Sequence, residues 1–293
     1  MKSFPRFNLV RKAYCTCPPK YNLNPYLGRC MHGCLYCYAV KFPSFNGPIK
    51  PRINLPEILE KIAEKTKPKL YVMLSDSTDP YQPIEKDLGL TRKCLKILAK
   101  HEFPVLIVTK SDLFLRDLDI LVKTRSVVSV TITTLKEDLA KTFEPYTPPP
   151  EKRIKALEFT AKKGLPVVAR VDPIIPWVND DENDFRKLIL TLKSVGVKHI
   201  VVSTLKPVKG FFIKLRKVNP QLAEKLENIY RNGKRIAGYE YLPDDFRLKI
   251  ISKLRSIVLN EGLNFSSCRE GFPQLNTSIC DGSAYLQGQT ILT

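Results

Sequence analysis

The sequence predicts an α/β protein, in which a partial (β/α)6 barrel carries a C-terminal helical and loop extension. Short runs rich in β-branched residues alternate with longer stretches whose apolar residues recur three and four positions apart. This alternation is typical of βα units that build a parallel sheet. Six such units fit before about residue 205. Because a closed barrel needs eight, we expect an open barrel with a wide lateral mouth.

The individual elements follow from the same patterns. Strands are expected at 22–26, 69–75, 104–109, 126–134, 166–172 and 198–204. Helices are expected at 55–66, 91–101, 114–124, 151–163 and 182–195, with a further helix at 243–262 that packs back onto the barrel. We therefore divide the chain into an N-terminal extension at 1–20, the partial barrel at 21–205, and a C-terminal extension at 206–293 that caps the barrel.

The charge and cysteine content restrict the class of protein. Lysine and arginine number 48 against 29 acidic residues, which gives a net charge of +19 and a pI near 9.6. Such a balance indicates a polyanionic partner. No apolar signal region opens the chain, and no apolar run reaches membrane-spanning length. We expect a cytoplasmic protein without a membrane partner, in which eight cysteines serve metal or redox chemistry.

Three of these cysteines form one short motif. Cys30, Cys34 and Cys37 have the spacing C-x3-C-x2-C on a loop after the first expected strand. That loop would lie at the C-terminal rim of the barrel, where α/β barrels hold their chemistry. Three thiolates leave one position of a four-ligand metal centre open. An alternative is a zinc site completed by Cys15 or Cys17.

With Tyr36 before Cys37, the motif resembles the signature of the radical S-adenosylmethionine (SAM) enzymes. The resemblance implies that the three cysteines hold a 4Fe–4S cluster and that SAM chelates the open iron. One electron, from a reductant such as ferredoxin or flavodoxin, would cleave SAM to methionine and a 5′-deoxyadenosyl radical that abstracts hydrogen. The ring of Tyr36 would lie near the adenine.

A wider resemblance extends over most of the chain. Segments 24–39, 75–92, 143–158, 170–180 and 266–283 resemble the spore photoproduct lyase-related proteins, also called DNA repair photolyase-like. True spore photoproduct lyase repairs a thymine-dimer adduct in DNA with a cysteine hydrogen donor at the end of the second strand. Here Met73 and Leu74 precede Ser75 and Asp76, so no thiol stands at that position.

Several strand-end residues are candidates for holding SAM. Asp76 and Ser77 follow the second strand, where radical SAM barrels face the SAM amine. Thr133 and Thr134 end the fourth strand, near the expected ribose or carboxylate. Arg153 can bind a carboxylate through two hydrogen bonds. A plain turn and a solvated charge at a helix start are the alternatives.

The fifth strand carries two further candidates. If Val167, Ala169 and Val171 face the helices, Arg170 and Asp172 point into the barrel. Buried charges are costly unless they are paired or functional. Arg170 and Asp172 are therefore SAM-ligand candidates or an interior ion pair.

The remaining cysteines and one tyrosine add catalytic candidates. Cys15, Cys17, Cys268 and Cys280 would meet if the C-terminal segment folds back, and would then hold a second iron–sulfur cluster or zinc. Alternatively, Cys268 is the hydrogen donor that the second strand lacks, or all four are ordinary small residues. Tyr239 lies in a loop that reaches the mouth, where a tyrosine can relay a hydrogen atom; core packing is its alternative.

A basic and aromatic stretch follows the sixth strand. Basic groups bind phosphates, and aromatic rings stack on unpaired bases. An amphipathic helix with buried phenylalanines is the alternative. The stretch comprises Lys206, Lys209, Phe211, Phe212, Lys214, Arg216 and Lys217.

The sequence thus predicts a radical SAM enzyme that acts on DNA or RNA, by lesion repair or base modification. One alternative is a radical SAM enzyme that modifies a protein or small metabolite. Another is a nucleic-acid- or ribosome-binding protein whose cluster is structural or redox-sensing. The oligomeric state does not follow from the sequence.

Overall fold

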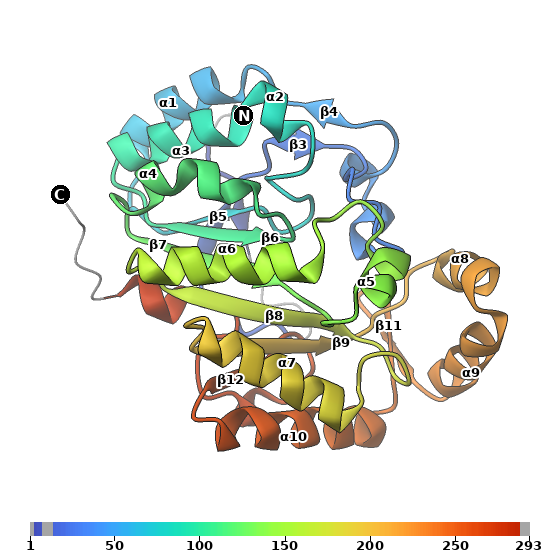
Figure 1. Ribbon diagram of the computed structural model, residues 1–293. Coiled ribbons are helices and arrows are strands. Elements are labelled where there is room, and N and C mark those ends of the chain that lie inside the picture. Colours follow the sequence, from blue (N-terminus) through green and yellow to red (C-terminus); the bar gives the residue numbers. More distant parts are fainter. Residues whose placement is uncertain (1–2, 8–13, 288–293) are drawn as a thin grey trace.

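An eight-stranded sheet forms the centre of the computed structural model, which describes residues 3–7 and 14–287 (Figure 1). Its strand order is β1-β2-β5-β6-β7-β8-β9-β12; β1 is antiparallel to β2, and all other neighbours are parallel. The α/β class and five of the six expected strands are confirmed, whereas the first sheet strand of the barrel lies at Lys20–Asn22 and not at 22–26. The strands are β1 (Arg6–Phe7), β2 (Lys20–Asn22), β5 (Val72–Leu74), β6 (Val105–Thr109), β7 (Ser126–Thr131), β8 (Val167–Ile174), β9 (His199–Thr204) and β12 (Asn264–Ser267).

Helices cover the outer face of this sheet, and two small hairpins lie outside it (Figure 1). The expected helix at 114–124 is instead a 3-10 turn, Leu113–Asp117, followed by one short helix. The helices are α1 (Leu55–Lys65), α2 (Glu85–Leu88), α3 (Leu90–Lys100), α4 (Leu118–Leu121), α5 (Glu137–Phe143), α6 (Pro150–Lys162), α7 (Glu182–Ser194), α8 (Phe211–Val218), α9 (Pro220–Arg231) and α10 (Asp244–Asn260). The hairpins pair β3 (Tyr26–Leu27) with β4 (Lys50–Pro51) and β10 (Lys234–Ile236) with β11 (Tyr239–Tyr241).

The alternation of side chains along β8 separates the two faces of the sheet. Val167, Ala169 and Val171 belong to the large core between sheet and helices. Arg170 and Asp172 consequently point into the barrel, as the sequence pattern predicts. The parallel sheet therefore has an apolar outer face and an inner face that becomes polar toward its carboxyl edge.

The C-terminal segment fills the part of the barrel interior that lies away from the carboxyl edge of the sheet. Leu286, in the 3-10 turn Ser283–Leu286, packs against inward-facing Leu106, Val127 and Val168. Gly282 introduces this turn at φ +86°, and a Cβ there would lie 3.0 Å from Val168 Cγ2. Only glycine satisfies both the backbone conformation and the close approach. The last described residues thus plug the barrel.

The structure adds a parallel strand that the sequence pattern does not indicate. β12 lies beside β9 and contains a single large apolar residue, Phe265. Its serines are satisfied by side chains: Ser266 Oγ lies 2.9 Å from His199 Nε2, and Ser267 N donates to Asn276 Oδ1 at 2.7 Å. A strand whose buried polar groups are paired in this way lacks the usual apolar signature.

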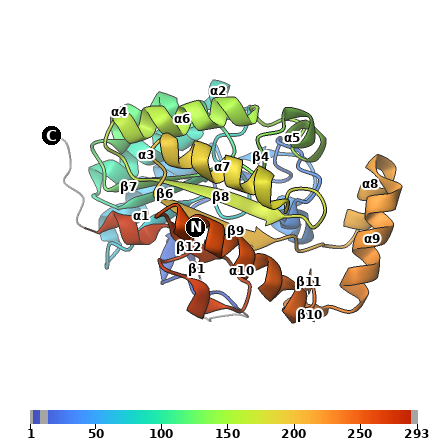
Figure 2. The ribbon, with the colours of Figure 1, turned by 60° about the horizontal axis from the view of Figure 1, so that its bottom comes forward.

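Helices α8 and α9 form a hairpin that projects beyond the carboxyl ends of β8 and β9 (Figures 1 and 2). Its base is held by a separate apolar cluster that includes Phe211, Leu215, Leu226 and Tyr230. Among the described residues, no helix has the length and apolar character needed to cross a membrane.

The buried imidazole of His199 makes stability depend on pH. Burial and the nearby Arg170 lower its pKa to about 4, against about 6.5 in an unfolded chain. The unfolded chain therefore binds more protons between these values, and stability falls as the pH drops from 6.5 toward 4. We expect a loss of about 3 kcal/mol from this group. Urea unfolding across this range should show a flatter profile for His199→Gln; parallel profiles would contradict the assignment.

Candidate active site at the carboxyl ends of the strands

A cavity of about 320 Å³ lies where the parallel strands end. Thr109, Thr131, Asp172 and Thr204 line it from the carboxyl ends of four successive strands. The cysteine loop, β11 and the segment after β12 complete its wall. This is the edge at which α/β sheets collect polar side chains from separate strands around one ligand.

Cys30, Cys34 and Cys37 all line this cavity. Gly33 gives the loop its shape, because its φ is +65° and an added Cβ would lie 2.8 Å from Tyr146 Cδ2. Leu35 N donates to the carbonyl oxygen of Phe143 at 2.9 Å. The loop is thus held against the end of α5 and the segment that follows.

The three thiols fit a polynuclear metal cluster. Burial raises the pKa of Cys30 to about 12 and also raises the pKa of Cys34, so these sulfurs become thiolates only beside a strong positive charge. Among described residues, no three His, Cys, Asp or Glu side chains surround a point where a single metal ion could sit. A zinc site completed by Cys15 or Cys17, like any single-ion site among the described residues, would need its side chains to rearrange. Ligands of a cluster bind different irons and need not converge.

The buried carboxylate of Glu144 holds the cysteine loop in place through hydrogen bonds. Glu144 Oε1 accepts hydrogen bonds from the Tyr36 hydroxyl and, at 3.0 Å, from Thr133 Oγ1. Arg153 Nη1 lies 2.7 Å from Glu144 Oε2 and also donates to the carbonyl oxygen of Thr131 at 2.8 Å. Tyr36, which lines the cavity, is thereby fixed in place.

These contacts correct three expectations about SAM ligands. Arg153 is 1% exposed and directs its guanidinium at protein oxygens, so it is not available to a SAM carboxylate. Thr133 and Thr134 line a different hollow beside α7. The reason is that β7 ends at Thr131, and this residue reaches the cavity instead.

The acidic turn after β5 lies at the cavity as expected. Asp76 and Ser77 both line it, and Asp76 Oδ1 accepts from Asn22 Nδ2 at 2.6 Å and from Ser77 Oγ at 3.0 Å. In the structure Asp79 lines the cavity and its Oδ2 lies 3.3 Å from His32 Nε2 inside the cysteine loop.

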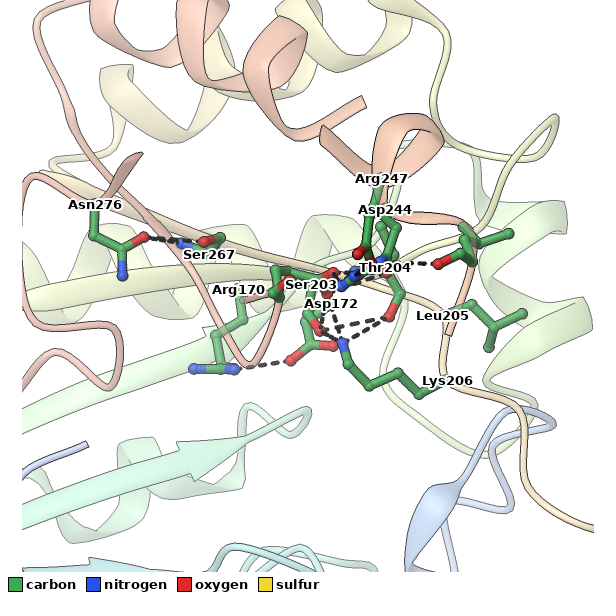
Figure 3. Close-up of polar contacts among 12 residues, drawn as sticks. Arg170, Asp172, Ser203, Thr204, Leu205, Lys206, Asp244, Arg247, Ser267 and Asn276 are labelled. Carbon is green, nitrogen blue, oxygen red and sulfur yellow. Dashed lines mark hydrogen bonds and ion pairs between the residues drawn. The ribbon is translucent and has the colours of Figure 1, made fainter. Parts of the chain in front are cut away.

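Charged side chains pair at the ends of β8 and β9 (Figure 3). Arg170 Nη2 and Asp172 Oδ2 are 2.8 Å apart, so the interior ion pair is formed. Buried Glu270 accepts from Thr204 N at 2.7 Å and from Lys206 Nζ at 2.6 Å, and lies 3.2 Å from Arg247 Nη1. Lys206 is therefore an ion-pair partner at the cavity and not an outward phosphate ligand.

The rest of the basic and aromatic stretch is divided between core and surface. Phe211 is 3% exposed, and Phe212 packs against Phe211 and Tyr230. These rings belong to the hairpin core, which corrects the expectation that they stack on bases. Arg216 pairs with Glu227. Within the described chain, no ion pair involves the three remaining cations, Lys209, Lys214 and Lys217.

The structure brings the four remaining candidate cysteines together. Cys15, Cys17 and Cys268 line the cavity, and Cys280 lies behind them. The Sγ atoms of Cys17 and Cys280 are 3.7 Å apart. Hydrogen bonding from Cys280, together with Arg170, lowers the pKa of Cys268 to about 7 although burial opposes the shift.

Tyr239 also reaches the cavity, from β11. Its ring is 4% exposed and meets Tyr38 edge-on at 6.1 Å. Lys41 Nζ lies 3.4 Å from the ring centroid and the Arg269 guanidinium 4.7 Å from it. Two cationic side chains therefore lie against the Tyr239 ring.

Three cations at the cavity were not singled out from the sequence. Arg29, Lys110 and Arg269 line it, and none has a carboxylate at ion-pair distance in the described part of the chain. Arg269 Nε is buried without a hydrogen-bond partner. Their sequence signal was weak, because each is a single basic residue in a loop.

Comparison with known proteins places this site in a family. Residues 24–203 match the radical SAM superfamily, and the chain belongs to it. The enzyme is therefore a radical SAM enzyme, as predicted, and the family implies a 4Fe–4S cluster and SAM as cofactors. Four cysteines lie outside the matched range: Cys15, Cys17, Cys268 and Cys280.

The chain is also similar to individual curated proteins. The protein MJ0683 of Methanocaldococcus jannaschii is 38% identical over 170 residues, which are 56% of this chain and 63% of that protein. The radical SAM Nα-GlyT isomerase of Pseudomonas phage M6 is 20% identical over 84% of this chain and 53% of its own.

Solved structures show the fold. A spore photoproduct lyase variant has a TM-score of 0.70 at 16% identity and covers 91% of this chain and 79% of its own. SuiB of Streptococcus suis, bound to its precursor peptide SuiA, has a TM-score of 0.56 at 12% identity, over 87% and 52% of the two chains. The expected likeness to spore photoproduct lyase-related proteins is confirmed.

The ion pair below the cysteine loop can be tested by unfolding. Arg153→Met would leave the Glu144 carboxylate buried without its cation, so we expect a loss of about 3–5 kcal/mol in the free energy of unfolding. Adding Glu144→Gln should recover part of that loss. Urea unfolding at pH 7 measures both.

The matched control is Lys155→Met, on the exposed face of the same helix. Its surface pair with Glu151 should contribute no more than about 1 kcal/mol. Strictly additive effects of the two buried substitutions would show that Arg153 and Glu144 do not act as a pair.

Proposed function

We propose that this radical SAM enzyme acts on a nucleic acid, DNA or RNA, and repairs a lesion or modifies a base. The observation that carries the proposal is the set of three cations, Arg29, Lys110 and Arg269, which line the cavity with no carboxylate at ion-pair distance among the described residues. SAM brings only one carboxylate of its own. A polyanionic substrate would supply phosphates for the others, and the net charge of +19 favours the same partner.

Within this proposal, residues of the cavity divide into two groups. Cys30, Cys34 and Cys37 would hold the cluster, and the cluster with SAM supplies hydrogen abstraction when bound. Asp76 and Ser77 present oxygens suited to the SAM amine. Further SAM contacts would come from Tyr36, Arg170 and Asp172, all of which line the cavity.

The substrate would meet the other side of the cavity. Tyr239 lies between Lys41 and Arg269. Its ring would contact a base, while the cations would bind the phosphates of the same nucleic-acid strand. Exposed rings near the strand ends, Trp177 at 42% and Tyr146 at 68% exposure, offer stacking surfaces for neighbouring bases. A base inside a duplex would first have to leave the stack.

Two structural neighbours are known in complex with different kinds of molecule. One is spore photoproduct lyase complexed with a dinucleoside spore photoproduct, and the other is SuiB with a precursor peptide. The basic cavity favours the nucleotide class for this chain. A peptide or small metabolite is the alternative that the binding experiment below addresses.

The cofactor assignment predicts the outcome of anaerobic reconstitution with iron and sulfide. The chain should bind about four irons at the Cys30 loop and form 5′-deoxyadenosine with SAM and dithionite. Cys34→Ala should lose both, because the cluster loses one of its three thiolate ligands. Cys94→Ala, which removes a buried thiol from the core of α3, should retain both. Product formed by Cys34→Ala would contradict the assignment.

The substrate assignment predicts salt-dependent binding. Affinity for single-stranded DNA or RNA should fall steeply between 50 and 200 mM salt, as counterion release requires. Arg269→Gln should weaken binding and reduce the salt slope by about one unit, whereas Lys155→Gln, on the outer helix layer, should leave both unchanged. Fluorescence anisotropy measures each value. Absence of binding, or binding insensitive to salt, would point to a peptide or metabolite substrate.

A further inference from the structure

Four cysteine side chains from the two ends of the chain form one continuous group beside the cavity. Cys15 and Cys17 precede β2, Cys268 follows β12, and Cys280 precedes the final 3-10 turn. The Cys17 and Cys280 sulfurs are 3.7 Å apart. The Cys15 side chain contacts that of Cys17, and Cys280 contacts Cys268. Residues separated by 263 positions in sequence therefore place their thiols together.

We propose that Cys15, Cys17, Cys268 and Cys280 bind a second metal centre, a single tetrahedral ion of which zinc is the expected occupant. Four thiolates are the ligand set that structural zinc sites use. The four cysteines lie outside residues 24–203, although three of them line the same cavity as the Cys30 loop. It is therefore an addition to the radical SAM domain.

The sulfur spacing favours one ion over a cluster. Zinc–sulfur bonds of about 2.3 Å place the sulfurs of a tetrahedral site ~3.8 Å apart, close to the 3.7 Å between Cys17 and Cys280. Ligands of a four-iron cube stand on different irons and lie farther apart.

Metal binding would close the group. The contacts run as a chain from Cys15 through Cys17 and Cys280 to Cys268, and in the described residues no three of these sulfurs yet surround a point. Rotation of the two end side chains about χ1 would bring their sulfurs inward, a change between staggered rotamers. Cys15, at one end of the group, is only partly buried.

Hydrogen-bonding neighbours surround the cysteine group. Four thiolates and one divalent ion carry a net charge of −2. Lys20, which is 1% exposed, lies beside Cys17, and Arg170 contacts Cys268. Each of these cations is also paired with a carboxylate, Asp281 and Asp172 respectively. The hydroxyl of Thr16 lies 3.7 Å from Cys280 Sγ. Such neighbours can orient metal ligands through hydrogen bonds.

The proposal changes the role expected of Cys268. A cysteine that ligates a metal is held as a thiolate and has no S–H bond from which to donate a hydrogen atom. Cys268 would then complete the cavity wall as a ligand. The metal would fasten both ends of the chain beside the substrate cavity, next to the Lys20–Asp281 ion pair.

The test uses the full chain carrying Cys30→Ala, Cys34→Ala and Cys37→Ala, so that the radical cluster contributes no iron. After zinc-supplemented growth and chelator-free anaerobic purification, mass spectrometry should find about one zinc per chain. Cobalt(II) substitution should give sulfur-to-metal charge-transfer absorption. Cys17→Ala with Cys280→Ala should abolish both signals, and Cys94→Ala should not change them.

Because the double variant removes two buried side chains, Cys15→Ser provides a milder test. It should fold, by circular dichroism, and lose zinc to a chelator at least tenfold faster than the parent. Absence of stoichiometric metal together with four titratable thiols in the group would overturn the proposal. A Cys17–Cys280 disulfide, or iron and sulfide in place of zinc, would also overturn it. None of these outcomes depends on nucleic-acid binding or SAM cleavage.

Discussion

The cavity depends on two buried carboxylates, each neutralised by an arginine. Glu144 lies beneath the cysteine loop with Arg153, and Glu270 lies at the end of β9 with Arg247. A carboxylate removed from water is stable only with such partners. Because each network also takes hydrogen bonds from a loop or strand end, the desolvated charge fixes the backbone around it. The buried ion pairs thus hold the polar end of the barrel in place, as apolar packing does in the rest of the sheet.

Much of the barrel could be predicted from the sequence because its strands are buried on both faces. Strands such as β7 read as continuous β-branched runs, and the C-x3-C-x2-C spacing is local. The inward direction of Arg170 followed from simple alternation along β8. These features depend on neighbours in the chain, so the sequence contains them directly. β12 escaped prediction because its serines are satisfied by residues that are distant in sequence.

The polar partners were the least predictable part of the site. Arg153 has the chemistry of a carboxylate ligand, but its partner proved to be Glu144 of the protein, nine residues earlier. Lys206 and Phe211 fit a nucleic-acid motif locally. In the structure, however, Lys206 forms an ion pair with Glu270, and Phe211 packs in the hairpin core. A side chain often has two equally suitable partners. Tertiary packing decides which of them it meets, and composition and spacing do not encode that packing.

The C-terminal plug has a consequence for biosynthesis. Leu286 fills the barrel interior beneath strands that leave the ribosome more than 80 residues earlier, and Asp281 pairs with Lys20 near the other end of the chain. Contacts of such long sequence separation form late, since the intervening chain must be ordered first. The cavity wall therefore closes only after residues 281–286 have been synthesised. Until then the cysteine loop stays accessible, which leaves an interval in which iron and sulfide can be delivered to it.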